Sequence, residues 1–193
     1  MQRDIPKGSR GLLIAVRFLT SLALSLWIGG MAFFGIMAAP VMFRLARQSS
    51  APEVAPQMVG AMLTRFGFVT TICAVLMIIC WFIDGALSGS RAQRLWKVQG
   101  GLSLICLALS LYLNGYLLPR TQAQQPDILP IFARDARGEN LTQAEIAKRA
   151  TFDKGHKEYQ RLASVNLYLL LGVMGILIAR GVGETGMRRA ESL

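Results

Sequence analysis

Four long stretches of the sequence lack charged side chains, and they predict the plan of the molecule. Residues 18–43, 66–83, 98–119 and 162–179 contain no Asp, Glu, Lys, Arg or His. Each stretch reaches the ~18 residues that indicate a helix able to cross a bilayer. A chain of 193 residues has too little other sequence to cover four such segments in water. The pattern therefore predicts an all-α fold, an integral membrane bundle of four transmembrane helices.

The polar residues between these stretches set the expected boundaries. We expect one domain with helices at about residues 10–43, 55–87, 97–118 and 142–183, and a polar loop at 119–141. Pro40 and Pro119 are expected to kink or end their helices, because proline removes a backbone donor and crowds the preceding turn. The first apolar run continues to about Phe43, far beyond the roughly 7–15 residues of a signal peptide, so we expect it to stay attached.

The fourth helix changes character along its length. Thr142 and Glu145 have the spacing of a capping box, which predicts a helix start in water. Charged residues follow as far as Arg161 and then stop until Arg180. Two opposite-charge pairs with i,i+4 spacing are expected on the charged part: Asp153–Lys157 and Lys154–Glu158. One long helix is therefore expected to leave water through an amphipathic charged section and enter lipid.

The charge balance bears on partners and on orientation. The formal charge is +10, yet the 21 Lys and Arg residues are spread over the termini and all loops without a nucleic-acid-binding motif. We expect them to meet anionic lipid headgroups rather than nucleic acid. Basic residues are densest on the side of the two termini, which predicts a bacterial inner-membrane protein with both termini in the cytoplasm.

Small residues at helical spacing predict where other helices approach. Such residues let two backbones come close inside a membrane, and they suit contacts with other integral membrane subunits. The candidate helix-packing positions are Ser21, Ser25, Gly29 and Gly35 in the first helix, and Gly175, Ala179 and Gly183 in the last.

His156 is the only histidine and the first candidate for chemistry. A single imidazole cannot form a typical zinc site, so no metal site is expected. Three roles stay open: a structural or solvated side chain, a recognition residue, or an axial ligand to a haem or chlorophyll-type pigment supplied by a partner. The sequence itself requires no cofactor, and contact with such a pigment or with lipid would arise within a complex.

The remaining candidates lie in the predicted spans. Cys73, Cys80 and Cys106 are expected to be packing residues, and the seven-residue spacing of the first two excludes a disulfide between them in a regular helix. Arg17 and Asp84 lie toward the same membrane side and are expected to pair. A proton or ion pathway through them stays open, because immersed charges are expensive to keep.

Two short motifs suggest a family. The first helix contains Trp27, Gly29, Gly30, the Ala39–Pro40 step and Phe43. The last helix contains an F-D-x-x-H element followed by an asparagine: Phe152, Asp153, His156 and Asn166. Together they resemble a bacterial membrane-protein family of unknown function related to eukaryotic transmembrane protein 205. The resemblance implies a four-helix membrane bundle and brings no established activity.

No nucleophile–base set or phosphate-binding loop accompanies these features, so we do not expect an enzyme. The leading expectation is an accessory or scaffolding subunit of a larger energy-transducing membrane complex, photosynthetic or respiratory. The alternative is a small ion or metal transporter or resistance protein that uses Asp84, Arg17 and the intramembrane cysteines.

Overall fold

The computed structural model describes residues 7–48, 54–88 and 94–191, the side chains of residues 7–9, 47, 136 and 182–191 excepted. This part of the chain is helical apart from a few turn residues and has no strand. The first long helix comprises α1 (Lys7–Phe33), the π-helical turn η1 (Phe34–Ala38) and α2 (Ala39–Gln48), and the second is α3 (Val54–Ser88). The third comprises α4 (Arg94–Tyr112), the π-helical turn η3 (Leu113–Leu117) and α5 (Leu118–Ala123). The short α6 (Gln125–Ala136) and the long α7 (Gln143–Glu191) complete the chain.

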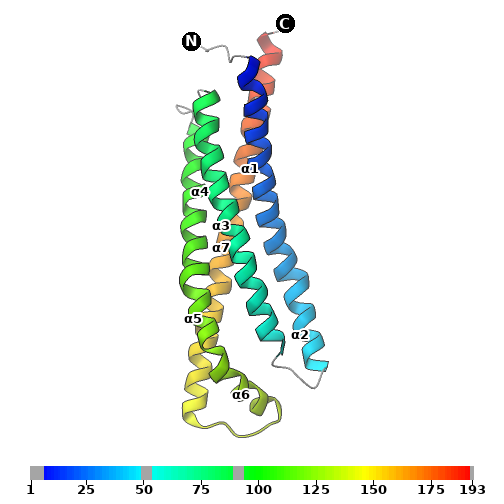
Figure 1. Cartoon of the computed structure of the whole chain (residues 1–193), viewed down its shortest axis with the longest axis vertical. Helices are drawn as coiled ribbons and strands as arrows, with labels where there is room; N and C mark the ends of the chain where they lie inside the picture. The colour runs from blue at the N-terminus through cyan, green and yellow to red at the C-terminus, as the bar shows by residue number, and fades with distance from the viewer. Residues whose placement is uncertain (1–6, 49–53, 89–93, 192–193) are drawn as a thin grey trace.

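The long helices run side by side along the longest axis of the molecule (Figure 1). The helix α1 packs on α3, α3 on α4 and α4 on α7, while α1 and α7 meet less closely. The start of α1 and the end of α7 lie at the same end of the bundle, and α6 folds against α7 at the other end. Four helices are long and apolar enough to cross a membrane, which agrees with the four predicted spans.

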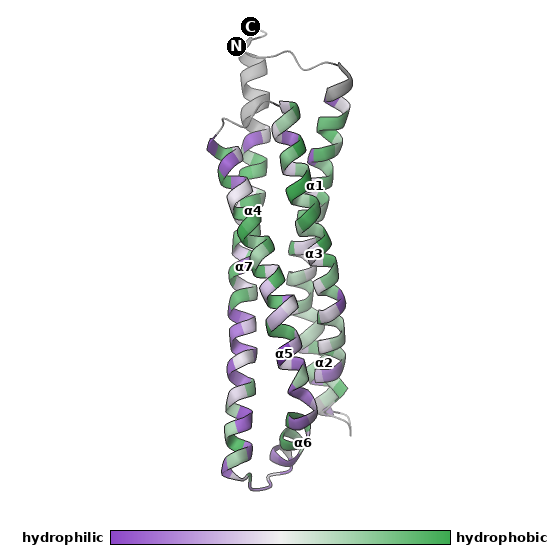
Figure 2. Ribbon diagram, turned by 60° about the vertical axis from the view of Figure 1, so that its left-hand side comes forward, coloured by the Kyte–Doolittle hydropathy of each residue, from purple (hydrophilic) through white to green (hydrophobic). Residues whose placement is uncertain are grey.

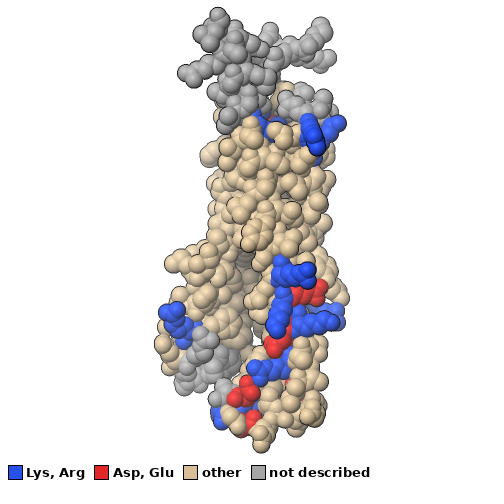
Figure 3. Space-filling view, turned by 180° about the vertical axis from the view of Figure 1, so that it is seen from behind, with Lys and Arg blue, Asp and Glu red and all other residues tan. Residues whose placement is uncertain are grey.

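The exterior of the bundle is apolar where the charged residues are missing. Large side chains such as Ile14 and Phe68 are 70% and 73% exposed, and a broad uncharged belt crosses the face of the molecule seen in Figure 3. Buried residues from all four long helices nevertheless form one core, which includes Trp27, Met77 and Leu170. An apolar exterior around a packed core suits a bundle with lipid as its solvent.

Two prolines expected to kink or end their helices instead follow π-helical turns. The turns η1 and η3 each end two residues before a proline, Pro40 and Pro119. In both, the residue before the proline donates its N–H to the carbonyl five residues earlier, Ala39 to Phe34 and Leu118 to Leu113. Because a proline ring crowds the carbonyl four residues before it, the wider π turn lets the helix continue. The first and third helices therefore extend beyond the predicted ends at 43 and 118.

The prediction of a polar loop at 119–141 is wrong for residues 119–136. Residues 118–123 and 125–136 form α5 and α6. Of the two prolines that follow Pro119 in this segment, Pro126 lies in the first turn of α6, where the missing N–H costs nothing, and Pro130 lies inside the same helix. Ile128 and Ile131 are buried, so α6 is held by an apolar face that turns toward the bundle.

The beginning of α7 shows the predicted capping box. The Thr142 backbone N–H donates to the Glu145 carboxylate at 2.8 Å, and the Glu145 N–H donates to the Thr142 hydroxyl at 3.3 Å. The hydrophilic half of α7 gives way to an apolar half (Figure 2). The two predicted i,i+4 ion pairs do not form within the described residues. Asp153 lines a cavity, and Glu158 accepts a hydrogen bond from the Tyr112 hydroxyl at 3.5 Å. Ion pairs of α7 form with α6 and its turn instead, as between Arg149 and Asp135.

Ion pairs hold the turn between α6 and α7. Arg134 lies 2.9 Å from the Glu139 carboxylate and 2.5 Å from that of Glu145, and Arg137 lies 2.7 Å from Glu139. Hydrogen bonds from the Arg137 and Arg134 side chains hold the pKa of Glu139 below its ordinary value. Gly138 within the turn has a φ of 75°, a left-handed conformation that glycine adopts without steric cost.

Candidate functional sites

A buried charge cluster joins the four long helices near the end that carries the termini. Asp84 from α3 accepts hydrogen bonds from Arg17 of α1 at 2.9 Å and from Arg180 of α7 at 2.5 Å. Arg180 also donates to the Gln99 amide oxygen of α4 at 2.5 Å. Asp84 is 4% and Arg180 6% exposed, and both arginines make further interactions. One polar contact set therefore reaches every long helix.

The predicted partners Arg17 and Asp84 are thus brought together, but two members of the cluster were not expected. Arg180 was assigned to the membrane boundary because it is the first charge after an apolar span. Gln99 gave no signal beyond being a polar residue near the start of a span. Their inclusion depends on the rotation of α4 and α7, which places both side chains inward. Buried charges in such a cluster must be paired to be tolerated.

A cavity of about 230 Å³ lies beside this cluster, where α1 and α7 meet. Arg17 and Ser21 contribute from α1, and Met174, Ile178 and Arg180 from α7. The cavity is therefore lined by the guanidinium groups of Arg17 and Arg180 and by apolar side chains of α7. It marks the least tightly closed seam of the bundle.

A second polar set lies between α3 and the third long helix, where α4 meets η3. The Asn114 side-chain amide donates to the Thr70 hydroxyl at 3.2 Å and to the Ser110 hydroxyl at 3.1 Å. Gly67 makes room for Asn114, whose side chain occupies the space that a Cβ at position 67 would need. Asn166 on α7 is 2% exposed, and its Oδ1 has no hydrogen-bond partner within the described part of the chain.

The motif tryptophan and glycines have different surroundings. Trp27 is 1% exposed in the core, and the Phe66 ring occupies the space that a Cβ at Gly30 would need. Gly29, the preceding residue, is exposed and has open space around it. The double glycine therefore serves an internal helix contact with Gly30 and lies on the exterior of the bundle with Gly29.

The other small-residue positions also lie mostly outside the core. Gly35 and Gly175 have open space at the Cβ position, and Ser25 and Ala179 are exposed. Ser21 is half-buried and lines the cavity between α1 and α7, while Gly183 lies outside the residues whose surroundings are described. The strips predicted for helix packing are thus turned largely away from the bundle itself.

The three cysteines are buried and free. Within the described residues, no group of three or more His, Cys, Asp or Glu side chains is placed to hold a metal ion.

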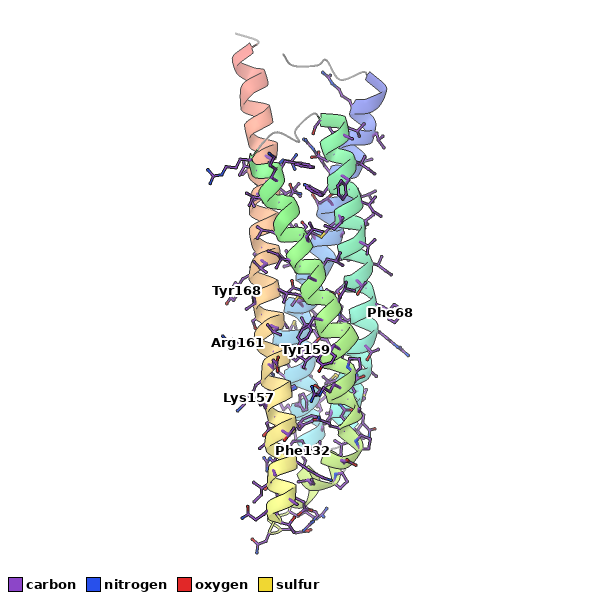
Figure 4. The ribbon with its side chains drawn as sticks, turned by 90° about the vertical axis from the view of Figure 1, so that its left-hand side faces the viewer. Phe68, Phe132, Lys157, Tyr159, Arg161 and Tyr168 are labelled. Atoms are coloured by element: carbon purple, nitrogen blue, oxygen red, sulfur yellow. The ribbon has the colours of Figure 1, made fainter. Side chains whose placement is uncertain are left out.

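A cavity of about 220 Å³ lies at the other end of the bundle, between α3, α5, α6 and α7. The F-D-x-x-H element lines one wall with Phe152, Asp153 and His156, and Phe43 of α2 contributes as well. Figure 4 shows Tyr159 and Phe132 directed into this region, whereas Lys157 and Arg161 project away from the bundle. Phe43, the last residue of the first motif, and the F-D-x-x-H element, more than a hundred residues later in the chain, therefore share one cavity.

Ring contacts hold the aromatic side chains of α7 that line this cavity. His156 stacks on Phe152 with an interplanar angle of 5° and a centroid distance of 6.2 Å, and Phe152 meets Phe132 edge-on at 5.9 Å. The His156 Nε2 lies 3.0 Å from the Gln160 side-chain amide nitrogen. His156 is thus held as one member of an aromatic row.

Two glutamines close the opposite wall of this cavity. The Gln122 amide donates to the Gly60 carbonyl at 2.7 Å, and the Gln125 amide donates to the Pro56 carbonyl at 3.3 Å. Both amide groups lie against Gly60, 3.2 Å from where its Cβ would be. Neither glutamine was a predicted site residue, because both fall in the segment that was expected to be irregular.

These features define a class of protein: an all-helical bundle with four helices long and apolar enough to cross a membrane. A family model for a domain of unknown function, DUF4149, matches residues 22–127, more than half of the chain, and the protein belongs to this family. The match includes the Trp27 motif and ends in α6, before the F-D-x-x-H element. No curated protein and no solved structure gives a significant match to the chain. The relation to eukaryotic transmembrane protein 205 and the bacterial origin stay predictions.

Proposed function

We propose that this protein works through lateral association in a membrane, as an accessory or scaffolding subunit of a larger complex. The observation that carries the proposal is the outward direction of its small-residue strips. On α1, Ser25, Gly29 and Gly35 are exposed, and both glycines have open space around them. Inside a membrane, such small residues permit a second helix to approach closely, and van der Waals packing then drives the association.

The seam between α1 and α7 supports the same proposal. Ser21 continues the α1 strip into the cavity at this seam, and Gly175 and Ala179 are exposed on α7. Both helices thus present small side chains to the exterior beside the cavity between them. A neighbouring subunit that packs here would gain close contact without rearranging the core.

Paired glycine variants test the proposal. Gly29→Leu places a large side chain on the proposed contact surface, and Gly101→Leu places the same side chain on α4, where the exposed glycine also has open space. Purification in mild detergent, with light scattering and mass spectrometry of what co-purifies, should show a partner with wild type and Gly101→Leu but not with Gly29→Leu. Migration of the wild type as a lone monomer, or equal behaviour of the two variants, would contradict the proposal.

The proposed setting is the bacterial inner membrane with both termini in the cytoplasm and the α6–α7 turn outside. The supporting argument is the density of basic residues beside the helix ends on the side of the termini. A single cysteine introduced at Gly138, in a background without Cys73, Cys80 and Cys106, should react with an impermeant maleimide in intact cells. An energy-transducing complex, photosynthetic or respiratory, is the proposed partner assembly, and co-purification would identify it.

Transport of an ion or metal is the second proposal. The buried carboxylate of Asp84 beside a cavity is the feature in its favour, although two guanidinium groups already occupy its oxygens. The test is the flux of the ion or metal into vesicles that contain the purified protein. Asp84→Asn and Cys80→Ser should reduce this flux if these residues lie on the transport route. Unchanged flux in both variants would exclude that route.

A further inference from the structure

The cavity between α3, α5, α6 and α7 has a charge pattern that differs from the rest of the protein. The chain carries +10 overall, yet among the residues that the structure describes no Lys or Arg lines this cavity, and Asp153 is the one carboxylate among them. Within the described residues, the Asp153 side chain forms no ion pair and accepts no hydrogen bond. A half-buried carboxylate that no hydrogen bond or ion pair satisfies attracts a cation.

Three basic residues near Asp153 on α7 do not neutralise it. Burial lowers the pKa of His156 despite the opposing effect of the Asp153 charge, and this favours the neutral ring. Arg149, one turn earlier on α7, is paired with Asp135 at 2.5 Å and lies over the Phe132 ring, 5.2 Å from its centroid. Lys157, one turn later, projects away from the bundle (Figure 4). The negative charge of the cavity wall is therefore available to a ligand inside.

Aromatic rings supply the rest of the wall. Phe43, Phe132, Phe152 and Tyr159 line the cavity together with the His156 ring. The negative face of an aromatic ring attracts a positive charge, and pockets that combine such rings with a carboxylate suit substituted ammonium groups better than small hydrated metal ions. Aliphatic residues such as Val59 and Ile128 provide space for an apolar body.

We propose that this cavity is a binding site for a monovalent organic cation, an ammonium group carried on a small apolar or aromatic body. The ammonium group lies between Asp153 and the rings of Phe152 and Tyr159. The apolar body points toward α3 and α6. The site is independent of the proposed lateral association, because it lies at the opposite end of the bundle from the cavity between α1 and α7.

Three small ligands test, on the unaltered protein, which sign of ligand charge the cavity prefers. Benzyltrimethylammonium, benzyl alcohol and phenylacetate carry positive, zero and negative charge on one kind of aromatic body. Calorimetric titration of the full chain in a non-ionic detergent should show the cation binding at least about fivefold tighter than either of the others. A smaller preference, or none, would overturn the proposal without any variant having to fold.

Matched carboxylate variants then locate the site. Asp153→Asn keeps the shape and removes the charge, while Glu158→Gln removes a carboxylate on the same helix outside the cavity lining. Benzyltrimethylammonium should bind Asp153→Asn at least about fivefold more weakly and Glu158→Gln about as tightly as wild type. An affinity for Asp153→Asn within fivefold of wild type, or an equal loss in both variants, would place the cation elsewhere and refute the assignment.

Discussion

Replacement of Asp84 by alanine should destabilise the bundle more than any loss of an exposed carboxylate. Asp84 bridges Arg17 and Arg180, whose side chains are 26% and 5% exposed. Removal of one partner from a buried ion pair costs about 3–5 kcal/mol, because the remaining charge stays away from water without compensation. The two lost hydrogen bonds to charged groups, at about 1.5–3 kcal/mol each, lead to a similar figure.

Thermal unfolding in a mild detergent measures this effect. With roughly 2–4 °C per kcal/mol for a chain of this size, Asp84→Ala should lower the Tm by roughly 6–20 °C. Asp127→Ala is the control, because Asp127 is exposed on α6 and its loss should stay within about 0.5 kcal/mol.

A second substitution separates the charge from the packing. Arg180→Met in the Asp84→Ala background removes the buried positive charge and keeps an apolar side chain of comparable length. Replacement of both members of a buried pair is often nearly neutral, and Arg17, which is partly exposed, can reach the interface. The double variant should therefore recover most of the lost Tm. An Asp84→Ala protein as stable as wild type, or a double variant less stable than Asp84→Ala, would refute the role of the Asp84 charge cluster in stabilising the bundle.

Three further outcomes follow from the fold. Gly100→Ala should lower the free energy of unfolding by about 1–3 kcal/mol through overpacking, because the Trp81 indole occupies the space of the new methyl group. Gly101→Ala is the control and should leave the Tm unchanged, because this glycine has open space around it. Equal Tm values for the two variants would contradict this packing. Thr142→Ala should cost about 1 kcal/mol by loss of the helix cap, seen as faster hydrogen exchange in the first turn of α7 but not in its centre. Because the pKa of Glu139 is depressed, its ion pairs stabilise the α6–α7 turn above the ordinary glutamate pKa of 4.5 and are lost as the pH falls through the folded value. Proteolysis of this turn should accelerate on acidification in wild type and be fast at all pH values in Glu139→Gln.

The stacked tryptophans show why the packing of α3 on α4 could not be predicted from spacing alone. Trp81 and Trp96 stack at 4.3 Å, and each indole N–H donates to the backbone carbonyl of the other residue, at 2.9 and 3.3 Å. Gly85 and Gly100 make this possible, because an indole ring lies where each would carry a Cβ. In the sequence these are two unremarkable glycines and two tryptophans fifteen residues apart.

The local sequence pattern was sufficient to predict those features that depend only on one segment of the chain and the solvent around it. The lack of charge over 162–179 and the capping box at Thr142 predict a helix that starts in water and continues as an apolar span. Hydrophobic length and hydrogen-bond spacing along one helix do not depend on the remainder of the chain. The common membrane side of Arg17 and Asp84 followed in the same way from counting spans.

Only the tertiary structure decided which side chains meet. Arg180 entered the charge cluster, and Asp153 and Phe43 came to share a cavity, because of how the helices are rotated about their axes. Rotation is set by close contacts such as Phe66 over Gly30, which act between segments distant in the chain. A sequence pattern gives the apolar length of a helix, but in a span that is apolar on every side it leaves undetermined which face turns inward.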